Sequence, residues 1–347
     1  MESKKITIKD IAKLANVSHP AVSMALNNRP GVGEEKRQEI LKIAKQTGYQ
    51  PNLVAKALVS KQSYTIGLII NNISDQYYTE LAKGVEETAS KFGYNIILCT
   101  TNGSSKSQKK YLDVLRARGV DGIIISTVLF NDPHIKFLVK ERFPFVCLNR
   151  VSLSRSLNNK VDYVTLDNYS AGYKGIEHLW KLGHDRIAII TGSLNASNAI
   201  ASLEGAKAAL LEHGIKIDPI LLREGNYSRQ NAYDAAKRLI KLKKPPTAIF
   251  AQDDNMALAV REVLLASGLK IPEDIALIGI DDIEMGALTG IDLTTISQKN
   301  YEMGYIGVKI LLKKIEKKAS PMVEKVVLEA ELIIRKTCGY YLYGYKR

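Results

Sequence analysis

The chain has 347 residues, of which 46% are hydrophobic and 24% are charged, and its net charge is +13. These proportions are those of globular proteins and exclude a wholly disordered chain. The longest apolar runs, Ile66–Ile70 and Gly122–Ile125, have the length of strands and exclude a membrane-spanning helix, which needs roughly 20 residues. No secretory signal is apparent and the three cysteines form no CxxC pair, so we expect a cytoplasmic protein without a metal site.

The first 63 residues are the concentrated basic part of the chain. They contain 11 Lys and Arg against 5 Asp and Glu, a balance that favours a polyanionic partner. Residues 1–60 show no convincing strand and three short helical patterns instead. Thr7 can cap the first helix and Ser18 the second. The third helix covers residues 34–47 and ends at Gly48.

The apolar residues of these three patterns fall on one face of each helix. Two short helices joined by a tight turn and braced by a third make a helix-turn-helix domain. Its second helix enters the major groove of DNA. The residues expected to face inward are Ile8, Ile11, Ala12 and Ala15 in the first helix, Val22, Ala25 and Leu26 in the second, and Ile40, Leu41 and Ala44 in the third.

A short segment after this head has the pattern of a hinge. Pro51 and Asn52 can start a helix there that continues to about Ser60. About nine residues cannot hold a stable helix alone in water. We therefore expect this helix to fold only when something packs against it.

From Thr65 onward, β-branched runs alternate with helix-length amphipathic stretches. This alternation predicts an α/β fold with two doubly wound lobes, each a parallel sheet with helices on both faces. Ligands bind at the carboxyl ends of such strands, so the cleft between the lobes is the expected binding site. The last pattern, VVLEAELIIR, is expected to be one strand. The helices are expected at 76–92, 105–118, 132–140, 196–213, 228–241 and 254–267.

Motifs along nearly the whole chain resemble one family. The head and hinge read TIKDIAKLANVSHPAVSMALNNRPGVGEEKRQEILKIAKQTGYQPNLVAKAL, and the body contains VDGIIIS, GHDRIAIITG, PTAIFAQDDNMALAV and IPEDIALIGIDD. In this order they are similar to the lactose-repressor (LacI/GalR) family. A lone helix-turn-helix is weak evidence, but head, hinge and body motifs in one order are highly specific. The resemblance implies a body like that of periplasmic binding proteins.

By this resemblance the chain divides into four parts. The head is expected at 1–49, the hinge helix and linker at 50–63, the body at 64–338 and a tail at 339–347. Within the body, we expect lobe 1 at about 64–165 and 297–322, and lobe 2 at about 166–296 and 323–338. The tail contains four tyrosines and no heptads, so we expect no tetramer-forming coiled coil.

The resemblance also implies which residues contact DNA. In the head they are Thr7, Ser18, His19, Pro20, Ala21, Ser23, Met24 and Asn27, and in the hinge they are Asn52, Ala55, Lys56 and Leu58. Ser18 can instead serve only as a cap, and Pro20 suits the first turn of a helix. Leu58 is expected to insert into a central base step of the minor groove. The alternative is that Leu58 packs against its own body.

Met24 departs from the arginine that the family commonly has at this place. Arginine reads guanine through paired hydrogen bonds, whereas methionine offers only an apolar contact. We therefore expect an operator that does not require guanine at that base pair. Gly33 replaces the usual Ser or Thr, which weakens the cap of the third helix by a few tenths of a kcal/mol.

In the cleft, the resemblance implies effector-binding residues at the strand ends. They are Tyr77, Tyr78, Asn149, Ser202, Tyr227, Asp253, Asp281 and Gln298. Carboxylates and amides that bind hydroxyls, beside aromatic rings that cover an apolar face, are the chemistry of sugar binding. Asp254 is expected to cap the following helix, and either of the paired tyrosines can be a core residue instead. Ser202 stands where many members carry an arginine that holds the effector, so we expect a neutral or cationic ligand or a degenerate cleft.

Three other functions compete with this interpretation. An enzyme is disfavoured because the chain has no GxGxxG after the first strand and no GxxxxGK[ST], GxSxG or HExxH, so we expect no catalytic residue, metal or cofactor. A solute-binding protein for transport is disfavoured by the head and the missing signal peptide. Control by a protein corepressor stays open beside control by a small ligand. The sequence thus predicts a homodimeric repressor of carbohydrate-related genes on a pseudo-palindromic operator.

Overall fold

The structure is a computed structural model that describes residues 6–26, 28–49, 62–129, 131–151, 157, 159–317 and 322–347. The chain forms two compact units, Met1–Ser63 and Tyr64–Arg347, here named the head and the body. Among the described residues, no helix has both the length and the apolarity needed to cross a bilayer.

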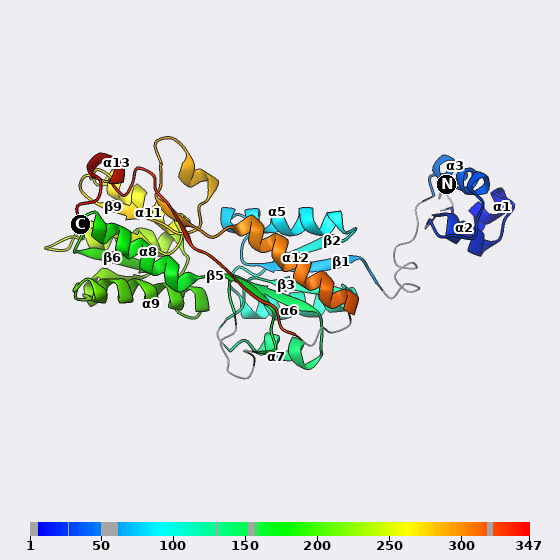
Figure 1. Ribbon diagram of the computed structural model, residues 1–347, viewed down its shortest axis with the longest axis horizontal. Coiled ribbons are helices and arrows are strands. Elements are labelled where there is room, and N and C mark those ends of the chain that lie inside the picture. Colours follow the sequence, from blue (N-terminus) through cyan, green and yellow to red (C-terminus); the bar gives the residue numbers. More distant parts are fainter. Residues whose placement is uncertain are drawn as a thin grey trace. The chain divides into compact units, whose positions relative to one another are not determined.

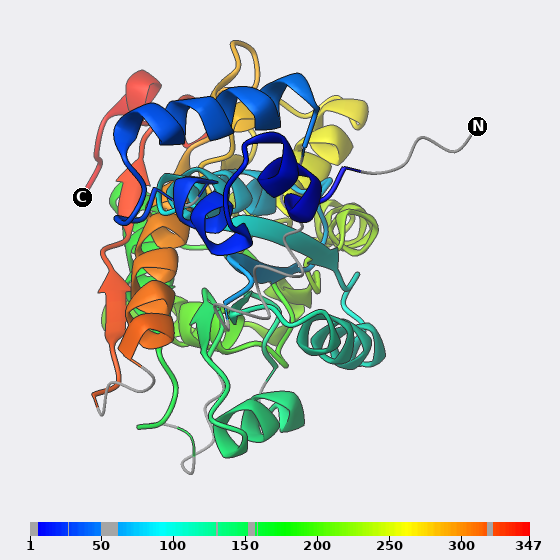
Figure 2. The ribbon, with the colours of Figure 1, turned by 90° about the vertical axis from the view of Figure 1, so that its right-hand side faces the viewer.

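Three helices form the head, namely α1 (Ile8–Leu14), α2 (His19–Leu26) and α3 (Glu34–Gln46). Figure 2 shows α3 lying across the other two. Each helix contributes its predicted apolar face to one small core, because side chains three or four residues apart share a side of a helix. The buried members of this core are Ile11, Ala12, Ala15, Val22, Ala25, Ile40 and Ala44.

The ends of the head helices follow the local sequence. Thr7 caps α1 in a reciprocal capping box with Asp10, as predicted. Gly33 precedes α3 without a side-chain cap, which is also as predicted. Leu41 was predicted to face inward and is instead 38% exposed. It follows Ile40, which fills the core, and successive residues point about 100° apart around a helix.

The first lobe of the body is built on a six-stranded parallel sheet in the order β11-β5-β4-β3-β1-β2. Both faces of the sheet are covered, α5 and α12 lying on one and α6 and α7 on the other (Figure 1). The strands are β1 (Thr65–Ile70), β2 (Asn95–Thr100), β3 (Gly122–Ile125), β4 (Phe145–Leu148), β5 (Tyr163–Leu166) and β11 (Lys325–Leu328). The helices are α5 (Gln76–Lys91), α6 (Ser105–Ala117), α7 (Pro133–Lys140) and α12 (Asn300–Lys317).

The second lobe has a four-stranded parallel sheet in the order β7-β6-β8-β9. Helices α8 and α9 pack side by side (Figure 1), and α10 packs against α11. The strands are β6 (Ile187–Thr191), β7 (Leu222–Glu224), β8 (Ala248–Ala251) and β9 (Ala276–Ile278). The helices are α8 (Asn168–Lys181), α9 (Ser197–Glu212), α10 (Arg229–Ile240) and α11 (Asp254–Ala266), with 3-10 turns at Pro219–Leu221 and Glu284–Ala287 and a short α13 at Tyr340–Tyr343.

The α8 and α9 backbones approach closely because glycines lie at their crossing. A Cβ added to Gly172 of α8 would lie 1.8 Å from the carbonyl oxygen of Ser202. A Cβ added to Gly205 of α9 would lie 1.9 Å from the carbonyl oxygen of Tyr169. Only glycine fits at these two places.

The chain passes more than once between the lobes, and here one prediction is wrong. The pattern VVLEAELIIR is not one strand of the second lobe, because it splits into β11 and β12 (Glu331–Ile333). β11 pairs in parallel with β5 of the first sheet, and β12 pairs antiparallel with β10 (Thr295–Ser297). Residues 323–328, which were assigned to lobe 2, therefore belong to lobe 1. The two halves share one local pattern but have different tertiary partners.

The predicted α/β class is confirmed, with a small all-α head and a body of doubly wound parallel sheets. Each of the six helices predicted in the body exists and agrees with the structure to within one residue at either end. The elements that were not predicted are β5, β7, β10, α8, α12 and the short α13. The pattern alone therefore located most of the elements whose ends surround the expected cleft.

Candidate DNA interface and effector cavity

One face of α2 presents the head residues that the sequence predicts at DNA. Val22 and Ala25 face the core of the head, so the residues on the other side of the helix are open to a partner. Ser18, His19, Pro20 and Met24 are exposed, and Ala21 and Ser23 are half-buried. A helix with this exposed side can enter the major groove.

The hydroxyls of Thr7 and Ser18 both serve as caps. The Thr7 hydroxyl accepts from the Asp10 backbone amide at 3.4 Å, and the Ser18 hydroxyl accepts from the Ala21 amide at 3.4 Å. The capping interpretation of Ser18 is thus supported, and a DNA contact from either hydroxyl comes in addition to its cap.

Two side chains hold the turn that follows α2. A Cβ on Gly31 would lie 3.0 Å from the Met24 sulfur, so Met24 packs on this turn while staying 36% exposed. Arg37 of α3 donates to the Asn28 side chain and, at 2.8 Å, to the Arg29 carbonyl oxygen. The role of Arg37 was not predicted, since a charged residue on an exposed helix carries no local sign of its partner.

The other predicted DNA contacts lie outside the described residues. They are Asn27 at the end of α2 and the hinge residues Asn52, Ala55, Lys56 and Leu58. Their roles stay predictions.

The carboxyl ends of the strands in the body surround a small cavity that opens to solvent. It gathers every predicted effector residue except Ser202, which is buried in α9 with its backbone against Gly172 of α8. Strand ends from both lobes meet here, as the doubly wound topology requires. The lining residues are Asn71, Asp75, Tyr77, Tyr78, Asn149, Arg150, Asn198, Tyr227, Asp253, Asp281 and Gln298.

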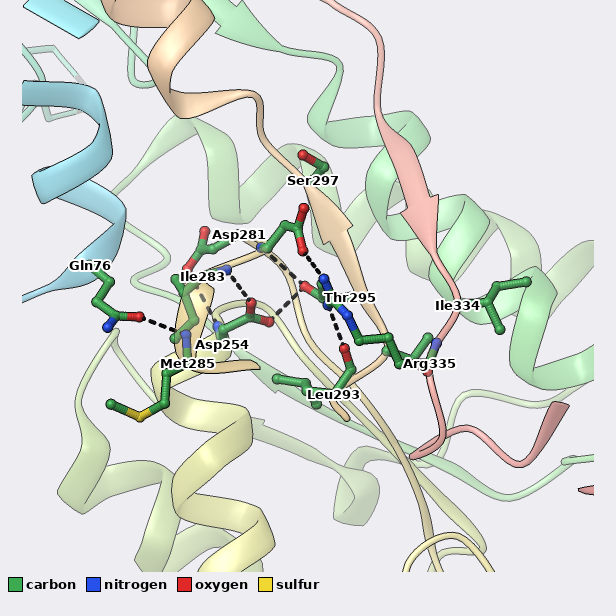
Figure 3. A network of polar contacts seen from close by, with 12 residues as sticks. Gln76, Asp254, Asp281, Ile283, Met285, Leu293, Thr295, Ser297, Ile334 and Arg335 are labelled. Atoms are coloured by element: carbon green, nitrogen blue, oxygen red, sulfur yellow. Dashed lines mark hydrogen bonds and ion pairs between the residues drawn. The ribbon is translucent and has the colours of Figure 1, made fainter. Parts of the chain in front are cut away.

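Asp253, and not Asp254, caps α11. The Asp253 carboxylate accepts from the Met256 amide at 2.7 Å, and its backbone is extended as an N-cap requires. The predicted capping role of Asp254 is therefore wrong, because Asp254 is already the first helical residue. Its fully buried carboxylate accepts instead from the Thr295 hydroxyl at 2.7 Å and the Ile283 amide at 3.1 Å (Figure 3).

Asp254 and its partners place Asp281 at the cavity. The Asp281 carboxylate accepts from the Gln298 side-chain amide at 2.5 Å and from the Asp254 backbone amide at 3.4 Å. The φ angles of Asp281 and Asp282 are 134° and 60°, in a region that non-glycine residues rarely adopt. Arg335 holds this loop by donating to Asp282 at 2.6 Å (Figure 3). The network connects the segment after β9 to β10 and to the segment that follows β12.

Four lining residues, Asn71, Asp75, Arg150 and Asn198, were not predicted, and among them Arg150 brings a positive charge. Its side chain is 8% exposed, and its guanidinium lies 5.0 Å from the ring centroid of Tyr227. Ser202 supplies no positive charge, as predicted, but Arg150 brings one from the end of β4. The only local signal was a basic residue directly after Asn149 at a strand end.

Burial changes the protonation of the cavity acids. It raises the pKa of Asp253 to about 7, and the neighbouring Asp75 adds to this rise. Burial, followed by the carboxylates of Asp253 and Asp254, raises the pKa of Asp281. These groups therefore hold protons more tightly than exposed carboxyls, and a positive group in the cavity would favour their ionised forms.

Residues 7–52 match the family described as bacterial regulatory proteins, lacI family, and residues 63–336 match the periplasmic binding proteins and sugar binding domain of the LacI family. The chain belongs to the LacI family. Among its relatives, catabolite control protein A of Priestia megaterium is 33% identical over 90% of this chain and 93% of that protein. The transcriptional repressor PurR of Histophilus somni is 31% identical over 95% of this chain and 98% of that protein.

Solved LacI-family structures agree over the same length. The lac repressor dimer bound to operator and the anti-inducer ONPF has a TM-score of 0.86 and 28% identity, covering 96% of this chain and 99% of that chain. The complex of the transcriptional regulator CelR with cellobiose has a TM-score of 0.74 and 27% identity over the same shares. The chain is thus a LacI-family DNA-binding transcription regulator, with a helix-turn-helix head and a ligand-binding type of body.

Proposed function

We propose that this regulator represses carbohydrate-related genes and is controlled by a small hydroxylated ligand in the body cavity. The observation that carries this proposal is the cavity itself, where buried carboxylates and amides meet three tyrosines at the strand ends of both lobes. Such groups bind hydroxyls in pairs while the rings cover apolar faces. The similar CelR structure holds cellobiose. The protein would act in the cytoplasm, without catalytic residues, metal or cofactor.

The DNA-binding form is proposed to be a homodimer. The similar lac repressor structure is a dimer on operator DNA, and two equivalent heads on one duplex favour a pseudo-palindromic operator. The α2 face would read the major groove. Thr7, Asn52, Ala55 and Lys56 would contact backbone or groove edge, and Leu58 would open a central base step.

Ligand control is proposed to act through contacts that join the lobes beside the cavity. Asn255 of the second lobe donates to Asp75 of the first at 2.9 Å. The Val151 amide donates to the Ser197 hydroxyl at 3.0 Å, and Gln76 accepts from the Met285 amide at 3.2 Å (Figure 3). A ligand that binds one arrangement of the lobes more tightly than another shifts the protein towards that arrangement. Its effect on DNA affinity is limited by the difference between its own affinities for the two arrangements.

Selection of genomic fragments by the purified protein, at controlled salt and with sequencing of the retained DNA, tests this function. We expect one enriched palindrome. We expect Leu58→Ala to reduce binding to this palindrome by at least about tenfold, because without the inserted leucine side chain the DNA would not bend and the contacts that depend on the bend would be lost. Leu211→Ala, at a body leucine that is 64% exposed, is the matched control and should bind normally. Equal retention of all fragments would leave only charge attraction and would contradict the proposal.

Met24 is expected to set one base preference of the operator. Met24→Arg should shift the preferred base at one position of each half-site towards guanine, because arginine can pair with its O6 and N7 atoms, with a discrimination of about 1–3 kcal/mol. Selection from a randomised operator library measures the shift. An unchanged preferred sequence would show that Met24 only packs on the turn at Gly31.

A further inference from the structure

Several polar atoms in the cavity wall have no hydrogen-bond partner within the part of the chain that the structure describes. Asn149, Asn198 and Gln298 are only 4%, 6% and 4% exposed, so their side chains have little access to bulk water. A buried polar group without a partner is unfavourable, and several of them around one cavity indicate groups that a ligand satisfies. The atoms are Asn71 Oδ1, Asn149 Oδ1, Arg150 Nε, Asn198 Oδ1 and Gln298 Oε1.

Most of these atoms are hydrogen-bond acceptors. The Gln298 amide illustrates this, because its nitrogen donates to Asp281 and its oxygen is thereby left for another group. The carboxylates of Asp75, Asp253 and Asp281 add further acceptor oxygens to the same wall. A ligand that satisfies this wall must bring mainly donors.

The charges on the wall also favour a donor with a positive charge. Three carboxylates line the cavity, whereas Arg150 is the one cation among its described lining residues. Its guanidinium lies against Tyr227 and balances one of them. The raised pKa values of Asp253 and Asp281 show that their ionised forms lack compensation in the unliganded cavity. A cation would supply that compensation, whereas an anionic ligand would oppose ionisation further.

We propose that the effector is a hydroxylated ligand carrying an amine, such as an amino sugar, whose ammonium group is held by the carboxylates of Asp253 and Asp281. This inference rests on the proposed ligand control of the cavity and names the class of its ligand. The hydroxyls of the ligand would bind the amide oxygens of Asn149, Asn198 and Gln298. Arg150 and the tyrosines would accommodate its ring and its acceptor oxygens.

Proton release distinguishes this ligand from a neutral sugar. The groups that face Asp253 are Asp75 before α5, Arg150 after β4, Tyr78 of α5, Tyr227, Asp254 of α11 and Asp281 after β9. Burial and then the Asp75 carboxylate raise the pKa of Asp253 to about 7, although the backbone amides of Met256 and Asn255 and the charge of Arg150 lower it. At pH 6.5 this carboxyl is mainly protonated, and an ammonium group drives its proton off on binding. A neutral sugar has no such effect.

Calorimetric titration of the full chain at pH 6.5 with matched sugars tests the proposal. The pairs are D-glucosamine with D-glucose, D-galactosamine with D-galactose and D-mannosamine with D-mannose, with D-glucuronate as the anion. We expect one amino sugar to bind at least tenfold more tightly than its parent. Repeating its titration in two buffers of different ionisation enthalpy should show net proton release. A parent sugar that binds as tightly, glucuronate as the best ligand, or no binding by any amino sugar would each overturn the proposal.

Asp253→Asn tests the residue directly. Asparagine keeps the cap of α11 but removes the charge, so the ratio of amino-sugar to parent affinity should fall towards one. Asp113→Asn is the matched control, because Asp113 is an exposed acid of α6 that pairs with Lys109, and the ratio should stay unchanged. An unaltered ratio in Asp253→Asn would overturn the assignment.

Binding to the selected operator in the same preparations separates this inference from the proposed function. If only a parent sugar releases the operator, ligand control is upheld, but the proposal that the effector carries an amine is overturned. Loss of all sequence-selective DNA binding by the unmodified chain would overturn the proposed function and the inference that rests on it.

Discussion

Replacing Gly172 by alanine is expected to lower the free energy of unfolding of the body by about 3 kcal/mol or more. The added Cβ would lie 1.8 Å from the Ser202 carbonyl oxygen and 3.0 Å from the Ala206 amide nitrogen, and neither backbone atom can yield without separating α8 from α9. In an open helix the same change stabilises by up to about 1 kcal/mol. The melting temperature, followed by circular dichroism, should fall by about 6–12 °C.

Ser90→Ala serves as the control for this effect. Ser90 is an exposed residue of α5, and its change to alanine should alter the melting temperature by little, since surface substitutions stay within about 0.5 kcal/mol. A Gly172→Ala variant as stable as the unmodified protein would show that the two helices do not cross at this distance.

Asp253→Asn is expected to stabilise the unliganded body above pH 7 by about 2–4 kcal/mol. Burial raises the pKa of this carboxyl from its ordinary 3.8 to about 7 in the folded protein. Between these two values the unfolded chain loses its proton first, so folding loses stability as the pH rises through this window. Asparagine carries no such charge and still caps α11. Urea unfolding at pH 5 and pH 8 measures the difference.

The gain from Asp253→Asn should be clearly smaller at pH 5 than at pH 8, because pH 5 lies early in the window between the two pKa values. Asp113→Asn again provides an exposed comparison and should show no such dependence on pH. A gain of equal size at both pH values would contradict the role of the buried charge and would indicate a simple packing effect.

Local chemistry made much of the fold predictable. Thr7 capped α1 as expected because a cap needs only a hydroxyl and the three residues that follow it. The helices of the body could be located from their amphipathic periods. Helix α8 was not predicted because its glycines, Gly172 and Gly175, lower helix propensity. These glycines allow close packing against α9 and Phe250.

The site was predicted as a set of residues and less well as a set of roles. The family resemblance placed Asn149, Asp253 and Asp281 at strand ends, and in the structure these strand ends meet at one cavity. The exchange of roles between Asp253 and Asp254 depended on one residue of helix register. Arg150 was missed because its burial follows from the meeting of two lobes, which no local pattern records.

The return of the chain to its first sheet has a consequence for synthesis on the ribosome. All four strands of the second lobe lie between Ile187 and Ile278, so this sheet can close early. The first lobe needs α12 and the edge strand β11 (Lys325–Leu328), which emerge later. Although domains generally fold in order from the N-terminus, here the sheet that begins first is completed last. A nascent chain halted before Lys325 would carry a finished second sheet and a first sheet that lacks one strand.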